Sequence, residues 1–209
     1  MTVLHFSQAS RVDNKRLDLV LASASPRRRE MLEMLRVPFR AVKSDYAEHN
    51  NAHSAPSALV MQHARQKAAA AGSRLRTGIV LGADTLVYCG RALFGKPADM
   101  ADAHRMLRAL QGKNHFVYTG IALLDVARGQ WLVDYVRTRV SMRALTDAEI
   151  ARYFSLVNPL DKAGAYAIQE AGGLIIDRID GCYYNVLGFP VAKVDDMLKE
   201  WGHTLFTGK

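Results

Sequence analysis

The chain has 209 residues, of which 49% are hydrophobic and 23% are charged, and its formal net charge is +8. This composition is typical of a folded globular protein and excludes a disordered chain. The apolar runs are shorter than the ~20 residues that a membrane span needs, and residues 1–16 lack the apolar core of a signal peptide. The two cysteines, Cys89 and Cys182, show no metal-binding spacing. We therefore expect reduced thiols, no zinc site, no membrane partner and a cytoplasmic location.

The positive net charge predicts attraction to phosphorylated ligands or polyanions. A basic nucleic-acid-binding module is one alternative. Such a module would show a basic stripe with interleaved aromatic residues, whereas the Lys and Arg residues here are spread among acidic ones. The sequence therefore favours a small phosphorylated ligand, and we expect no nucleic-acid partner.

The first elements are a strand that runs directly into a helix. Residues 19–22 form a short apolar run of buried-strand type, and Ser25 followed by Pro26 is typical of a helix start. The first turn of a helix has unpaired N–H groups, and Arg27 and Arg28 add positive charge there. Cations at this end oppose the helix dipole, so a bound anion such as phosphate would offset their cost. The simpler alternative is a solvated basic face.

The chain then alternates between strand and helix patterns. We predict a strand over residues 39–42, a polar loop over 44–55 that carries Glu48, and an Ala-rich helix over 56–74. His63 has the spacing of a helix-face residue, and we expect it to be that rather than a ligand.

A second buried strand is predicted over residues 79–83, with Asp84 and Thr85 at its carboxyl end. Open α/β sheets place their ligands at this end of their strands. A hairpin over 86–94 follows and leads to Lys96.

The rest of the chain continues the mixture of helices and strands. The predicted elements are a helix over 98–111, a β-hairpin over 114–143, a helix from Thr146 to about 156, a strand over 174–179 and a helix over 190–201. The expected fold class is α/β, with a mixed twisted sheet, flanking helices and two lobes. We expect residues 1–16 to be an N-terminal extension and residues 17–209 to be a single domain.

Several charged residues follow strands or turns instead of lying on charged helix faces. Glu48, Asp84 and Asp161 could converge on a divalent cation, which prefers oxygen ligands. Lys67 and Lys96 could contact phosphate as point charges, with Arg28 as a bidentate partner. Such a set suits metal-assisted attack of water on a phosphoanhydride, with a carboxylate as the proton acceptor. Taken singly, each of these residues is more simply a solvated surface charge.

Five segments in a fixed order resemble the signature of the Maf family of nucleoside triphosphate pyrophosphatases. They are Ser23-Ala24-Ser25-Pro26-Arg27-Arg28, Gly82-Ala83-Asp84-Thr85, Gly95-Lys96-Pro97, the stretch from Asp161 to Gln169, and the stretch from Tyr184 to Pro190. The resemblance spans about residues 17–200. It implies hydrolysis of a nucleoside triphosphate to a monophosphate and pyrophosphate with Mg²⁺ or another divalent ion. It also implies a mixed α/β sheet with two lobes around a cleft, similar to the fold of inosine triphosphate pyrophosphatases, and a homodimer.

The resemblance also assigns roles to individual residues. Asp84 matches the family's proton acceptor, and Glu48 matches a second acidic residue associated with the metal. Ser23, Arg28, Lys67 and Lys96 match positions that line the triphosphate.

The family divides by the base that it recognises. The branch that acts on dTTP and UTP is similar to this chain at Arg27, Thr85 and Gln169, whereas the 7-methylguanosine triphosphate branch carries Trp, Gln and Glu there. A Gln carboxamide offers both a donor and an acceptor to a uracil-type base. We therefore expect a house-cleaning dTTP/UTP pyrophosphatase that also accepts modified pyrimidine nucleotides.

Two alternatives to this branch are the 7-methylguanosine triphosphate activity and a regulatory or interaction role. The second arises because the family takes its name from an effect on septum formation in bacteria, and a fold alone does not fix function. The retention of Asp84, Lys96 and Gln169 favours an enzyme.

Overall fold

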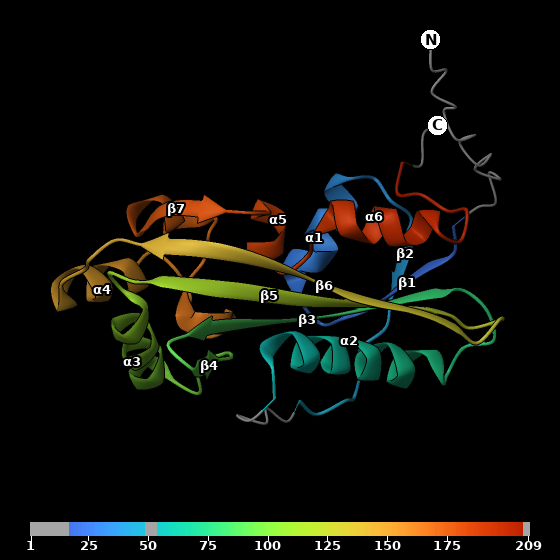
Figure 1. The fold of residues 1–209 in the computed structure, drawn as a ribbon, viewed down its shortest axis with the longest axis horizontal. Helices are drawn as coiled ribbons and strands as arrows, with labels where there is room; N and C mark the ends of the chain where they lie inside the picture. The colour runs from blue at the N-terminus through green and yellow to red at the C-terminus, as the bar shows by residue number, and fades with distance from the viewer. Residues whose placement is uncertain (1–16, 49–53, 207–209) are drawn as a thin grey trace, which may run out of the picture.

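The computed structural model describes residues 17–48 and 54–206, which form a mixed α/β fold around one seven-stranded sheet (Figure 1). The strand order is β2-β1-β3-β5-β6-β7, and β4 pairs with β3. The strands are β1 (Leu19–Ala22), β2 (Phe39–Ala41), β3 (Ile79–Cys89), β4 (Ala92–Phe94), β5 (Asn114–Asp125), β6 (Gln130–Met142) and β7 (Ile176–Asp180). The α-helices are α1 (Pro26–Met34), α2 (Pro56–Gly72), α3 (Met100–Leu110), α4 (Asp147–Phe154), α5 (Tyr183–Val186) and α6 (Val191–Lys199). Two 3₁₀ helices, η1 (Ala163–Ala165) and η2 (Glu170–Leu174), precede β7.

Strand β3 joins the parallel and antiparallel halves of the sheet. It pairs in parallel with β1, from Ile79 to Gly82, and in antiparallel fashion with β5 along nearly its whole length. The strands from β5 to β7 continue the sheet in antiparallel pairs. The predicted mixed sheet with flanking helices is therefore confirmed.

Helices cover both faces of the parallel half, so its strands are apolar on both sides. Successive side chains of a strand point to opposite faces. Leu21 and Leu81 pack in one cluster with residues of α1 and α6, whereas Val80 packs in another with Ala64 and Ala68 of α2. Figure 1 shows α2 along one face of the sheet and α1 and α6 on the other.

Two glycines allow α2 to lie unusually close to the sheet. A Cβ atom added at Gly82 would lie 2.1 Å from the carbonyl oxygen of Ala64, and one added at Gly120 would lie 2.2 Å from that of Val60. Both distances are far shorter than any real contact, so each position requires glycine. The backbone of α2 thus rests directly on β3 and β5.

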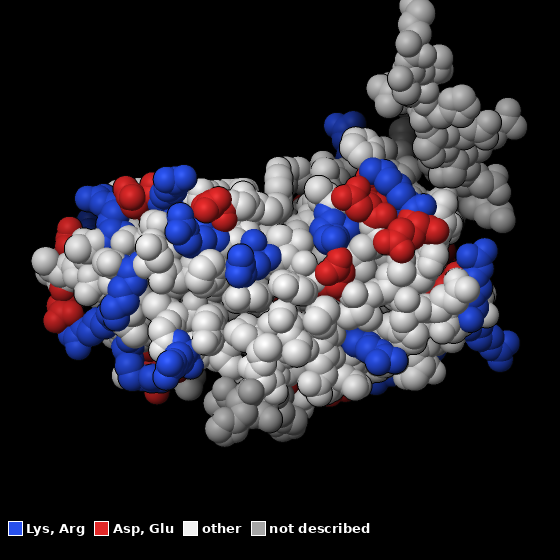
Figure 2. Space-filling view, viewed as in Figure 1, with Lys and Arg blue, Asp and Glu red and all other residues white. Residues whose placement is uncertain are grey.

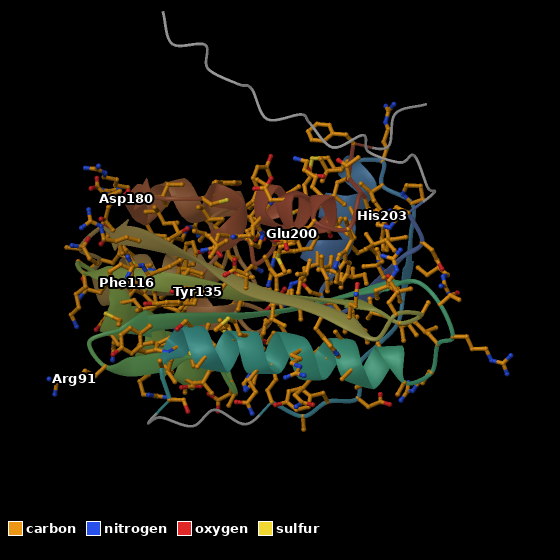
Figure 3. All side chains as sticks on the ribbon, turned by 45° about the vertical axis from the view of Figure 1, so that its right-hand side comes forward. Arg91, Phe116, Tyr135, Asp180, Glu200 and His203 are labelled. Atoms are coloured by element: carbon orange, nitrogen blue, oxygen red, sulfur yellow. The ribbon has the colours of Figure 1, made fainter. Side chains whose placement is uncertain are left out.

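A third cluster fills the other end of the molecule, where α3, α4 and the 3₁₀ segment pack against the antiparallel strands. In Figure 3, Arg91 in the β3–β4 turn and Asp180 at the end of β7 mark this end. Glu200 and His203, which follow α6, lie farther from this end. The pocket described below is lined by Leu187 of the first cluster and by Val87, Val117 and Tyr166 of the third.

The structure differs from the sequence prediction at three places. The strand predicted over 79–83 runs to Cys89, because its pairing with β5 continues, so Asp84 lies in the middle of β3 and the prediction of a strand end was wrong. The last strand begins at Ile176 rather than residue 174, and helix α5 was not predicted. The predicted extension over residues 1–16 lies outside the described residues, as do 49–53 of the polar loop.

No helix within the described ranges is both long enough and apolar enough to cross a membrane.

Candidate active site

The candidate site lies where the edge of β3 is left open. In the described part of the chain, β1 pairs with β3 only as far as Gly82, and β4 begins its pairing at Val87. Residues 83–86 therefore have no strand partner on that edge. A pocket opens there, and most of the predicted site residues line it: Arg27, Arg28, Glu48, Lys67, Asp84, Thr85, Lys96, Asp161 and Gln169. Ser23 lies next to it and accepts hydrogen bonds from the Ser25 backbone and from Arg28.

Strand alternation sends Asp84 and Thr85 to opposite faces of the sheet. Asp84 faces α2, where its Oδ1 accepts a hydrogen bond from Lys67 Nζ at 2.7 Å and its Oδ2 lies 3.2 Å from His63 Nδ1. Thr85 faces α1, where its hydroxyl accepts a hydrogen bond from Arg28 at 3.0 Å. The two residues thus connect the pocket to helices on both sides of the sheet.

The Asp84 carboxylate is buried but ionised. Only 4% of its side chain is exposed. Burial acts to raise the pKa of Asp84, but the hydrogen bond from His63 and the charge of Lys67 outweigh it and lower the pKa from 3.8 to about 2. At neutral pH, Asp84 is therefore a negative acceptor.

The two carboxylates of the site bind a positively charged side chain in the structure. The Lys67 ammonium lies 2.5 Å from Glu48 Oε1 and 2.7 Å from Asp84 Oδ1, so it bridges the two carboxylates. Glu48, His63 and Asp84 each offer a ligand atom, and these atoms lie within 4.8 Å of one another. Two carboxylates in such a position fit a hard divalent cation.

Asp161, the third predicted metal ligand, has other partners in the structure. Its Oδ2 accepts a hydrogen bond from Arg27 at 2.7 Å, and its Oδ1 accepts one from Lys162 at 2.9 Å. It is not a member of the Glu48–His63–Asp84 group. The structure thus brings two of the three predicted metal ligands together and ties the third to the other side of the pocket.

Arg28 forms an internal crosslink. Four of its five N–H groups donate to oxygens of the protein: Gly188 O, Ala83 O, Ser23 Oγ and Thr85 Oγ1. Its burial lowers the pKa of the guanidinium, which the Asp84 charge partly counteracts. A bidentate phosphate contact, as the sequence predicted, would require one of these hydrogen bonds to break. Arg28 thus connects the β1–α1 junction at Ser23 with β3 and with the turn between α5 and α6.

The far wall of the pocket is irregular chain that contains Gln169. Ala167, two residues before Gln169, is bound at both main-chain groups by the Tyr153 hydroxyl. This hydroxyl accepts a hydrogen bond from Ala167 N at 3.0 Å and donates one to Ala167 O at 3.4 Å. Tyr166 OH lies 2.7 Å from Nε2 of the buried His115. Burial raises the pKa of Tyr153 to about 12, so its hydroxyl keeps its proton. These tyrosines fix the main chain that carries Gln169.

Sequence reasoning missed three residues of the site. His63 was predicted to be a helix-face residue, yet its side chain is fully buried against Asp84. Lys162 is also buried, and its ammonium donates to Asn158 O at 2.8 Å. The only advance signal for His63 was its position four residues before Lys67, on the same helix face. Lys162 lies within the signature segment from Asp161 to Gln169, whereas for Tyr153 the sequence contains no comparable signal.

The fold is similar to that of a solved structure. The Staphylococcus aureus Ham1 protein superposes with a TM-score of 0.50 and 13% sequence identity, over 88% of this chain and 99% of that chain. At this identity the likeness shows the fold alone: the chain has a Ham1-like mixed α/β fold.

Sequence comparison is more specific. Residues 18–201 match the family described as Maf-like protein, and the chain belongs to this family. It is 46% identical to a dTTP/UTP pyrophosphatase of Gloeobacter violaceus, over 90% of this chain and 98% of that protein. Proteins of the same name from Caldicellulosiruptor bescii and Bacillus cereus are 42% and 44% identical, over 91% and 88% of this chain and 98% and 95% of theirs.

Proposed function

We propose that this protein hydrolyses dTTP and UTP to the monophosphate and pyrophosphate. One observation carries the proposal: an ionised, buried Asp84 beside Glu48 and Lys67 shares a single pocket with Gln169. The names of the relatives support the same reaction and the same bases. The role would be house-cleaning, with modified pyrimidine nucleotides as further substrates.

In this mechanism, Glu48 and Asp84 would hold a divalent cation, Mg²⁺ or Mn²⁺. When bound, the cation neutralises charge on the phosphate oxygens and makes water a better nucleophile. Lys67 and Lys96 attract the triphosphate as point charges. Asp84 orients the attacking water toward the α-phosphorus and accepts its proton at the carboxylate. With its pKa lowered to about 2, Asp84 is ionised at neutral pH and can only accept hydrogen bonds.

We assign base choice to Gln169 on the far wall of the pocket, together with Arg27 of α1 and Thr85 of β3. The Gln169 carboxamide offers a donor and an acceptor to the carbonyl and ring N–H of thymine or uracil. Arg27 contributes through its ion pair with Asp161, and Thr85 through its hydrogen bond with Arg28. A purine is larger than thymine or uracil, and we expect it to fit less well against these groups.

We further propose that the protein is cytoplasmic, that residues 17–209 form one domain and that two copies form a homodimer. The single sheet through the described residues supports one domain. Val133 and Tyr135 on β6 are more than a third exposed, and Val133 lines a shallow depression with Met61, Gln62, Arg65 and Gln66 of α2 that a second copy could cover. Sedimentation velocity will test the dimer.

The surface does not favour the nucleic-acid-binding alternative. On the face shown in Figure 2, Lys and Arg are more numerous at the end formed by α3, α4 and β7, but Asp and Glu lie among them. An uninterrupted basic stripe is not visible on that face.

The direct test is a panel of dTTP, UTP, CTP, ATP, GTP and 7-methylguanosine triphosphate, assayed for pyrophosphate release with Mg²⁺ and with Mn²⁺. We expect dTTP and UTP to be preferred by kcat/KM, and EDTA to abolish turnover until metal is restored. A preference for 7-methylguanosine triphosphate would overturn the branch assignment. Absence of pyrophosphate release from every nucleotide would favour the regulatory role linked to septum formation.

A further inference from the structure

His63 contacts the proposed catalytic carboxylate from behind. Its side chain is 0% exposed, and its Nδ1 lies 3.2 Å from Asp84 Oδ2. Among the described residues, Glu48, Lys67 and Asp84 line the pocket, whereas His63 does not. The imidazole is therefore close to Asp84 but separated from the space in which a substrate would bind.

The position of His63 follows from the way α2 lies on the sheet. Residues four apart share one helix face, so His63 and Lys67 project from α2 in the same direction. Asp84 lies two residues after Gly82 and pairs with Gly120, and the absence of side chains at both glycines brings α2 against β3. One helix face thus reaches both oxygens of one carboxylate.

The chemistry of the pair fixes the direction of the hydrogen bond. An ionised carboxylate can only accept, so Nδ1 of His63 carries the proton and donates it. Lys67 Nζ donates to the other oxygen, Oδ1, from the pocket side. With a donor on each oxygen, the carboxylate cannot rotate about its Cβ–Cγ bond without losing both hydrogen bonds.

We propose that His63 is a positioning residue, which fixes the Asp84 carboxylate through Oδ2 so that Oδ1 faces the pocket. This inference rests on the proposed function, in which Asp84 orients and deprotonates water. Groups that orient an active-site ligand or base in this way are typically needed for full activity although they never contact the substrate.

The competing role for His63 is that of a metal ligand, since its ring nitrogen belongs to the group of possible ligand atoms with Glu48 and Asp84. Its complete burial and its absence from the pocket lining argue against this role. The two roles differ in a measurable way, because an imidazole ligand would favour Mn²⁺ and Co²⁺ over Mg²⁺.

The test compares His63→Leu with His63→Asn. Leu removes the donor, and we expect kcat with dTTP to fall by about 10- to 100-fold while KM stays within about threefold. Asn places its amide nitrogen two bonds from Cβ, as in Nδ1, and should recover most of the activity. The matched control is His104→Asn on α3, where the ring packs against Phe154 and unchanged kinetics are expected. Full activity in His63→Leu, or no recovery in His63→Asn, would overturn the proposal.

Two further measurements make the result specific. In an Asp84→Asn background, His63→Leu should cause no additional loss, because a residue that acts through Asp84 has nothing left to position. Mn²⁺ binding followed by electron paramagnetic resonance, with Mg²⁺ as competitor, should show the same preference in wild type and His63→Leu. A selective loss of Mn²⁺ affinity would make His63 a ligand and contradict the inference.

The design also separates this inference from the proposed function. If Asp84→Asn is active, the role of Asp84 itself is wrong; if it is inactive while His63→Leu is fully active, only the role of His63 is wrong. Should His63→Leu fail to fold, His63→Gln replaces it. Its amide nitrogen lies three bonds from Cβ and misses the Nδ1 position, so Gln should be impaired where Asn is active. Equal activity of the two variants would overturn the proposal.

Discussion

The two walls of the pocket are built in different ways. On the Asp84 wall, Lys67 and Asp84 come from α2 and β3, two regular elements in direct backbone contact, and Glu48 comes from the loop between β2 and α2. On the Gln169 wall, they come from the η1–η2 segment, where Ala165 and Glu170 adopt left-handed backbone conformations that are uncommon for residues other than glycine. Regular elements fix the geometry of Asp84 through hydrogen-bonded backbone. The irregular wall depends instead on side-chain clamps such as that of Tyr153 on Ala167.

This contrast suggests that the two walls have different functions. The Asp84 wall holds ionised groups at short distances, as the reaction at a phosphorus atom requires. The Gln169 wall presents a neutral carboxamide, which suits the recognition of an uncharged base. Changes on the first wall should therefore reduce turnover for every nucleotide, and changes on the second should alter the choice among nucleotides.

The largest effect is expected for Asp84→Asn, which keeps the side-chain volume and removes the charge. Turnover should fall by at least ~10²-fold for dTTP and UTP alike, because both water and metal lose their carboxylate. Steady-state kinetics with a circular dichroism check of folding will measure this. The control is Asp147→Asn. Asp147 is an exposed carboxylate on α4 that pairs with Arg108 of α3, and this variant should retain full activity. If Asp84→Asn is active, the Asp84 wall does not control turnover, and the proposed difference in function between the two walls is wrong.

The next effect is on base choice. In Gln169→Glu, the carboxylate cannot donate to the base and repels its carbonyl groups. Unpaired buried polar groups cost about 1–3 kcal/mol, so kcat/KM for dTTP and UTP should fall by about ten- to hundredfold. The measurement is kcat/KM for dTTP, UTP, ATP and GTP in both proteins. If the ranking of the four nucleotides is unchanged, Gln169 does not read the base.

A smaller effect is expected behind the Gln169 wall. Tyr153→Phe removes the hydroxyl that binds both main-chain groups of Ala167, and it leaves the buried Ala167 N–H unpaired. We expect the free energy of unfolding to fall by about 1–3 kcal/mol and the preference for dTTP over ATP to weaken. Urea denaturation and a competition assay will measure the two effects. If turnover falls but the preference for dTTP over ATP is unchanged, Tyr153 supports the reaction and not the choice of nucleotide.

The smallest effect concerns stability at acid pH. The pKa of Asp84 in the folded protein, about 2, lies below its usual value of 3.8. A carboxyl with a lowered pKa stabilises the fold fully above its unfolded value, and that contribution is lost as pH falls through the folded value. In EDTA, the free energy of unfolding of the wild type should therefore fall relative to that of Asp84→Asn between about pH 4 and pH 2. A constant difference across this range would contradict the pKa shift.

The sequence predicted the regular wall better than the irregular one, for a physical reason. The strand–helix unit that begins at Leu19 has local signals in its apolar run and in Pro26, and both elements are present. The contact between His63 and Asp84 has no local signal, because it depends on Gly82 and Gly120 bringing α2 against the sheet.

The same limit applies to the charged residues. Arg28 and Asp161 were predicted as ligands of phosphate and metal from their residue types, but their partners in the fold come from distant segments. Arg28 donates to Gly188, 160 positions along the chain, and Asp161 accepts from Arg27, 134 positions away. Residue type and local spacing cannot show which charged groups pair with each other across such distances.

The most direct test of the account is the position of bond cleavage in dTTP. Wild-type enzyme with Mg²⁺ should convert dTTP in ¹⁸O-labelled water to equal amounts of dTMP and pyrophosphate, with the label in dTMP alone. That result would show that water attacks the α-phosphorus, as the arrangement of Asp84, Lys67 and Glu48 predicts. Formation of dTDP and labelled orthophosphate instead would contradict the central claim.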